Sequence, residues 1–130
     1  MQRGKIMQRK IARENAFILI FESVCKKDET AEEIFTKATE IRELEVDDYV
    51  RRVFFGSYEQ SAVIDEAIKR NSKGWKLERI SAVSMAILRL AAYEMLFDED
   101  IPERVSINEA IELSKKYDDE KSYAFVNGVL

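Results

Sequence analysis

The chain has no histidine, so it lacks the side chain that most often serves as a general base or a metal ligand near neutral pH. Its single cysteine, Cys25, excludes a disulfide within the chain, and one cysteine without histidine cannot make a zinc site. We interpret Cys25 as a small apolar residue rather than a nucleophile, because no histidine is available to activate it. The glycine-rich patterns that cradle phosphates, G-x-x-x-x-G-K-[ST] and G-x-G-x-x-G, are also absent. We therefore expect no enzyme, no metal and no cofactor.

Turn-forming residues are scarce, with four glycines and one proline among 130 residues, and this favours long helices over many strands. Hydrophobic residues make up 46% of the chain and charged residues 35%, a balance typical of a globular protein of one domain. No apolar run reaches about 18 residues, so we expect no membrane span. The early apolar run FILIF is too short for a secretory signal. A cytoplasmic location follows.

Acidic residues are nearly absent from the first 15 residues, which hold five basic residues and one acidic residue for a net charge of +4. The remaining residues hold 16 basic and 24 acidic groups, a net charge of −8. A basic arm on an acidic body is typical of proteins that bind a polyanion at one end. A solvated tail without function explains the composition equally well.

Apolar residues recur at helical spacing along the first half of the chain. A first helix is expected over about residues 8–25. A second begins after Thr30, because Thr30 and Glu33 form the T-x-x-E capping-box pattern. A third is expected from Asp47 or Asp48 to about residue 70. The segment after it, 71–75, forms a break, where Trp75 is interpreted as a core anchor.

The second half continues with three further helical patterns. Residues 82–96 are apolar almost all round, which indicates the buried centre of a bundle. Ser106 and Glu109 form an S-x-x-E pattern, which predicts that the next helix begins there. A last helix begins near residues 120–122. The sequence thus predicts an all-α fold, a compact helical bundle of six or seven helices in two packed sub-bundles, about 8–70 and 77–130.

A few polar residues stand within these apolar patterns. Arg89 and Glu94 predict a satisfied network of buried charges that braces the bundle. Asn108 and Asn127 are interpreted as residues that fix helix junctions. Gly128, which is unfavourable inside a helix, predicts close helix packing at that position.

The first helix begins with a cluster of cations formed by Arg9, Lys10 and Arg13, in which Arg9 and Arg13 share one face. Basic side chains and the free N–H groups of a helix N-terminus bind phosphate. Phosphate contacts do not read sequence, so specific RNA binding also needs aromatic side chains that stack on bases. Three phenylalanines are candidates, although core packing is the preferred interpretation for each: Phe17, Phe21 and Phe125.

Four segments in order, RKIARENAFILIF, ILRLAAYEM, SINEAIELSKKY and FVNGVL, together resemble the NusB family of bacterial antitermination factors. The resemblance covers nearly the whole chain. It implies an all-helical protein that pairs with NusE, a small-subunit ribosomal protein, and binds single-stranded boxA-type RNA. It also implies a place in the RNA polymerase antitermination complex, chiefly in ribosomal RNA operons.

The resemblance assigns roles by position. The residues that match RNA-binding positions are Arg9, Lys10, Arg13, Lys121 and Phe125. The residues that match the face toward NusE are Phe21, Glu78 and Ser84. Ile11 stands where the family can have a basic residue, which removes one expected phosphate contact. Ser84 departs from an acidic residue, so part of the NusE contact is open.

Two other interpretations stand beside this one. A NusB-like module also occurs as the N-terminal part of RNA cytosine methyltransferases, although this chain has no catalytic domain. A purely structural helical protein, whose basic arm has no role, is the other. Some family members self-associate, so a homodimer is also an open expectation.

Overall fold

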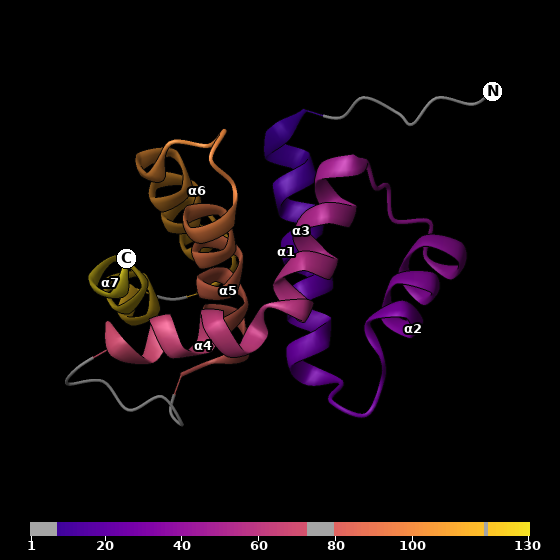
Figure 1. Ribbon diagram of the computed structural model, residues 1–130, viewed down its shortest axis with the longest axis horizontal. Coiled ribbons are helices and arrows are strands. Elements are labelled where there is room, and N and C mark those ends of the chain that lie inside the picture. Colours follow the sequence, from indigo (N-terminus) through magenta and orange to yellow (C-terminus); the bar gives the residue numbers. More distant parts are fainter. Residues whose placement is uncertain (1–7, 73–79, 119) are drawn as a thin grey trace.

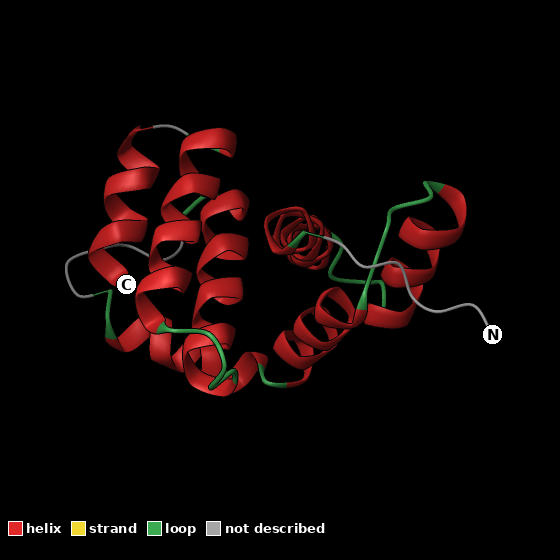
Figure 2. Ribbon diagram, turned by 90° about the horizontal axis from the view of Figure 1, so that it is seen from above, coloured by secondary structure: helices red, strands yellow, loops and turns green. Residues whose placement is uncertain are grey.

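The computed structural model describes residues 8–72, 80–118 and 120–130, and within these ranges all regular structure is helical (Figure 2). Side chains are described for all of these residues except 120–123 and 125. The helices of the described residues are α1 (Arg9–Cys25), α2 (Ala31–Thr36), the π-helical turn η1 (Lys37–Ile41), α3 (Asp48–Glu59), α4 (Ser61–Arg70), α5 (Ala82–Phe97), α6 (Glu103–Tyr117) and α7 (Glu120–Val129). The all-α prediction is confirmed.

The helices form two groups, one of α1, α2 and α3 and the other of α4 to α7 (Figures 1 and 2). Helix α1 packs against α3 within its own group and against α5 of the other group. Helix α5 also contacts α4, α6 and α7, and it buries residues on nearly every side, including Ile87, Leu88 and Leu90. The predicted central helix is therefore confirmed, and α5 lies where the two groups meet.

The starts of α2 and α3 follow their sequence signals. Thr30 caps α2, since its hydroxyl accepts the Glu33 N–H at 3.1 Å and the Glu33 carboxylate accepts the Thr30 N–H at 2.8 Å. Asp47 caps α3 by accepting the Val50 N–H at 2.9 Å. These caps satisfy backbone donors that have no partner within the helix, so both helices start where predicted.

The prediction of one helix from residue 48 to 70 is wrong. The chain turns at Gln60, whose φ of −97° and ψ of 19° lie outside the helical range, and α3 and α4 are separate. Helix α4 buries Ile64 and Ile68 and packs on α5, so it belongs with the second group. The two halves of the chain thus divide near Gln60 rather than at residues 71–75.

The start predicted for the helix at Ser106 is also wrong. Helix α6 begins one turn earlier, at Glu103, with Pro102 in extended conformation at the N-cap. Proline suits a helix start because it has no N–H to leave unpaired and it disfavours the helical conformation in the residue before it. Ser106 is therefore inside the helix, where its hydroxyl donates to Glu94 at 2.8 Å instead of capping the backbone.

Three residues expected to fix the bundle do not do so. Asn108 and Asn127 are exposed, and a Cβ added at Gly128 would meet nothing within 4 Å. The close helix approach occurs instead at Gly56 of α3, where an added Cβ would lie 2.5 Å from the Tyr93 hydroxyl of α5. Trp75 lies outside the described residues.

Candidate nucleic-acid interface

The N-terminus of α1 is an open, positively charged helix end. Gln8 occupies the N-cap without a side-chain hydrogen bond to the helix, and the first turn holds no acidic residue. Arg9 and Lys10 follow, and both side chains are exposed. Because the first N–H groups of a helix lack partners within it and carry the positive end of the dipole, this turn favours an anion.

Arg9 lies on the ring of Tyr49 from α3. The guanidinium carbon is 4.3 Å from the ring centroid, which is within the range of a cation–π contact. Tyr49 is only 3% exposed, so the ring is a part of the core that Arg9 covers. The pattern of apolar residues in α3 gave no signal for this role of Tyr49.

Arg13 has a different environment, although it lies one helical turn from Arg9. It is 4% exposed, its Nε donates to Glu94 Oε2 at 3.0 Å, and its Nη1 lies 3.8 Å from Glu109 Oε1. Burial alone would lower the pKa of Arg13, but Tyr49, Glu94 and Glu109 around it raise that pKa above its ordinary value. The predicted trio is thus divided into two exposed cations and one buried, paired cation.

Glu94 of α5 is the centre of this buried network. It is 1% exposed and accepts hydrogen bonds from Arg13, from the Tyr49 hydroxyl and from the Ser106 hydroxyl. Burial and the negative charge of Glu94 raise the pKa of Tyr49 far above its ordinary value, so the phenol stays protonated and donates. Helices α1, α3, α5 and α6 are joined at this carboxylate, which confirms the prediction for Glu94.

Arg89 does not take part in that network. Its Nε and Nη2 donate to the two carboxylate oxygens of Asp65 at 3.0 and 2.9 Å, a bidentate pair between α5 and α4. Asp65 is partly exposed, so this pair lies at the edge of the bundle rather than in its centre.

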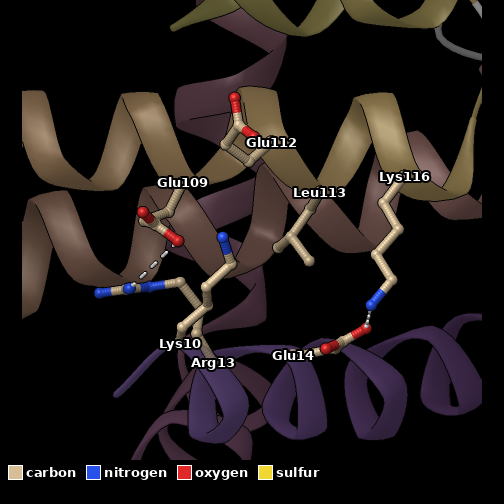
Figure 3. Close-up of a pocket in the computed structure, with 7 residues that line it drawn as sticks. All are labelled: Lys10, Arg13, Glu14, Glu109, Glu112, Leu113 and Lys116. Carbon is tan, nitrogen blue, oxygen red and sulfur yellow. Dashed lines mark hydrogen bonds and ion pairs between the residues drawn. The ribbon is translucent and has the colours of Figure 1, made fainter. Parts of the chain in front are cut away.

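A small cleft opens between α1 and α6 next to the charged turn (Figure 3). Its volume is about 120 Å³, and it is lined by Lys10, Arg13, Glu14, Glu109, Glu112, Leu113 and Lys116. Glu14 accepts a hydrogen bond from Lys116 Nζ at 2.6 Å and another from the Tyr117 hydroxyl. Burial would raise the pKa of Glu14, but these two donors outweigh it and lower the pKa. The sequence pattern could not reveal this contact, because Lys116 and Tyr117 lie 102 and 103 residues after Glu14 along the chain.

Of the three residues assigned to the NusE face, the structure describes Phe21 and Ser84. Phe21 is half-buried on α1, with its ring centroid 6.3 Å from that of Phe17, which is itself in the core. Ser84 is 1% exposed, and its hydroxyl donates to Asp118 at 2.9 Å. Glu78 lies outside the described residues. Lys121 and Phe125 belong to α7, but their side chains are likewise outside the described set.

Within the described ranges, no three metal-binding side chains gather at one point. None of the helices described there has the length and apolar character that crossing a membrane requires.

Sequence comparisons identify close relatives over almost the full chain. A profile of the NusB family matches residues 10–130. The transcription antitermination protein NusB of Clostridium botulinum (strain Alaska E43 / Type E3) is 47% identical over 128 residues, which cover 95% of this chain and 96% of the relative. The protein of the same name from Clostridium acetobutylicum is 44% identical and covers 95% of this chain and 93% of the relative.

Solved structures share the fold. NusB of T. maritima matches with a TM-score of 0.83 and 36% identity, over 96% of this chain and 89% of the other. A structure of the antitermination factors NusB and NusE in complex with dsRNA matches with a TM-score of 0.79 and 27% identity, over 93% of this chain and 91% of the other.

Proposed function

Because the chain belongs to the NusB family, we propose that it is a transcription antitermination factor that binds boxA-type RNA together with NusE. Its place of action would be the RNA polymerase antitermination complex on ribosomal RNA operons, in the cytoplasm. The family consists of antitermination factors rather than enzymes, in agreement with the expectation from the sequence.

The observation that carries the RNA-binding part is the open, basic first turn of α1. Arg9 and Lys10 are exposed beside N–H groups that the N-cap side chain of Gln8 does not bind, which is a favourable arrangement for a phosphate group. A relative of the same fold is seen with NusE and RNA, which supports both partners for this chain. We propose single-stranded boxA RNA as the ligand, with Lys121 and Phe125 of α7 extending the surface.

The three residues Phe21, Glu78 and Ser84 are proposed to face NusE. Ser84 contributes least to this proposal, because its hydroxyl is buried and already donates to Asp118. Phe21 retains some exposed ring surface, which an apolar side chain of NusE could cover.

The second candidate, an RNA-binding module of a cytosine methyltransferase, is less favoured. The relatives at 44–47% identity are antitermination proteins, and the match covers 93–96% of their length. The third interpretation, a purely structural helical protein, requires that the basic turn has no effect on RNA binding. The same experiment therefore tests it.

The test measures the affinity for boxA and for scrambled RNA, with and without NusE, at two salt concentrations. We expect boxA RNA to bind more tightly when NusE is present. The double variant Arg9→Glu/Lys10→Glu should lose affinity for RNA by roughly tenfold or more, and the slope of log affinity against log salt concentration should fall by about one to two. The control is Lys69→Glu/Arg70→Glu, which makes the same charge change at the end of α4. Equal affinity for boxA and scrambled RNA in the presence of NusE would contradict the proposal.

A further inference from the structure

We infer that Tyr49, anchored by Glu94, is a positioning residue that holds the guanidinium of Arg9 ready for an RNA phosphate. The inference rests on the proposed function, since it assumes that Arg9 contacts RNA. Tyr49 lies on α3 and is buried, so its proposed role in RNA binding acts through Arg9 of α1.

Three arginines surround the Tyr49 ring, and they differ in their carboxylate partners. The guanidinium carbons of Arg9, Arg13 and Arg52 lie 4.3, 5.7 and 5.8 Å from the ring centroid. Arg13 pairs with Glu94, and Arg52 pairs with Asp98. Within the described part of the chain, Arg9 has no carboxylate at ion-pair distance. Among these three cations, Arg9 is therefore the one whose charge is left for an outside anion.

The ring that carries Arg9 is held at both ends. Its body is packed in the core, and its hydroxyl donates to the buried Glu94 carboxylate. Glu94 is fixed in turn by Arg13 at 3.0 Å and by Ser106 at 2.8 Å. The ring thus has one orientation, and the guanidinium that lies on it has a defined position above α3.

Stacking on the ring leaves the phosphate-binding capacity of Arg9 intact. A cation–π contact uses the face of the planar guanidinium, whereas its N–H donors point outward in the plane. An arginine that is already ordered loses less rotamer freedom when it binds, so its phosphate contact costs less conformational entropy. Tyr49 would therefore strengthen RNA binding only through Arg9 and not through Lys10.

A double-mutant cycle tests this coupling. RNA affinity with NusE is measured for Arg9→Ala, Tyr49→Leu and the double variant, after circular dichroism has verified that each one is folded. We expect Arg9→Ala to weaken binding about five- to tenfold. We expect Tyr49→Leu to weaken it roughly two- to fivefold, and the Arg9→Ala loss to shrink by that same factor in the Tyr49→Leu background. Tyr49→Phe, which keeps the ring, should retain most of the Arg9 effect.

Lys10→Ala is the internal control, because Lys10 is exposed on the same turn but is not among the cations that lie over the Tyr49 ring. Its loss should be the same with and without Tyr49→Leu. If Tyr49→Leu also removes the Lys10 effect, Tyr49 only supports the fold and the inference is overturned. If Tyr49→Leu does not fold, Arg9→Lys replaces it: this variant keeps the charge without the planar group, and unchanged affinity would overturn the inference.

The inference and the proposed function fail in different ways. An unchanged affinity in Arg9→Ala would remove Arg9 from the RNA interface and contradict the function proposed for this turn. An Arg9→Ala loss that is the same with and without the Tyr49→Leu substitution would leave that function standing and remove only the role of Tyr49.

Discussion

At the scale of single residues, Arg9 and Arg13 show how four positions along a helix change the role of the same side chain. Arg9 lies on the Tyr49 ring with its charge open to solvent, while Arg13 is buried against Glu94. A buried guanidinium that loses its carboxylate is left as an uncompensated charge, which is much more costly than the loss of an exposed pair.

Glu94→Ala is therefore expected to destabilise the protein by about 3–5 kcal/mol, because it leaves Arg13 unpaired and the hydroxyls of Tyr49 and Ser106 without their acceptor. Asp65→Ala is the matched control, since it breaks the partly exposed pair with Arg89 and should cost less than about 1 kcal/mol. Urea unfolding followed by circular dichroism measures both. Equal costs for the two variants would mean that the buried Glu94 network adds no more stability than the partly exposed pair of Arg89 and Asp65.

The sequence could predict that Glu94 is buried but not that Arg13 is buried. A carboxylate inside the apolar helix α5 must be buried whatever packs around it. Arg13 lies on a helix that carries both apolar and charged residues, and its burial depends on its contacts with Glu94 of α5 and Glu109 of α6. The identity of Tyr49 as the surface under Arg9 also depends on packing between helices far apart in sequence, so spacing alone could not reveal it.

At the scale of helices, the packing of α3 on α5 depends on Gly56. Its missing side chain makes room for the Tyr93 ring, whose atoms would lie 2.5–2.6 Å from an added Cβ. Gly128 in α7 has the opposite setting, with open space at the same position.

Gly56→Ala is expected to destabilise by about 1–3 kcal/mol, because Tyr93 or the whole of α3 must shift. Gly128→Ala should stabilise by up to about 1 kcal/mol, since alanine favours a helix and meets no neighbour there. Thermal unfolding of both variants gives the comparison. A neutral Gly56→Ala would show that Tyr93 moves aside freely.

Helix starts were predictable where one side chain decides them, as at Thr30 and Asp47. The same pattern misled at Ser106, because S-x-x-E also occurs inside a helix and only Pro102 marks the actual start. The turn at Gln60 left no signal, since apolar residues keep helical spacing on both sides of it. There the packing of α4 on α5 decides the path of the chain.

At the scale of the molecule, the two groups of helices are linked across the cleft by Glu14 of α1, which accepts a hydrogen bond from Lys116 of α6 (Figure 3). The Tyr117 hydroxyl of α6 donates to the same carboxylate. The pKa of Glu14 is lower in the folded state than in the unfolded state. Its contact therefore contributes its full stabilisation at pH values above the unfolded pKa of a glutamate. That contribution is lost as the pH falls through the lower, folded pKa.

Glu14→Gln is thus expected to be less stable than the parent protein near neutral pH, with a difference that shrinks as the pH is lowered below the folded pKa of Glu14. Lys116 is exposed, so solvent screens the contact and the difference should be small. Urea unfolding across the acid range measures it, with Glu32→Gln on the exposed face of α2 as the charge control. A Glu14→Gln difference that stays constant with pH would exclude this titration.

The carboxylate of Glu94 also has a consequence for how the chain folds. Its three donors are 81, 45 and 12 residues away along the chain, and two of them come from the first group of helices while Glu94 and Ser106 belong to the second. Neither group alone can satisfy this carboxylate or neutralise Arg13. A state in which only one group is folded lacks this network, so we expect the two groups to form and melt as one cooperative unit.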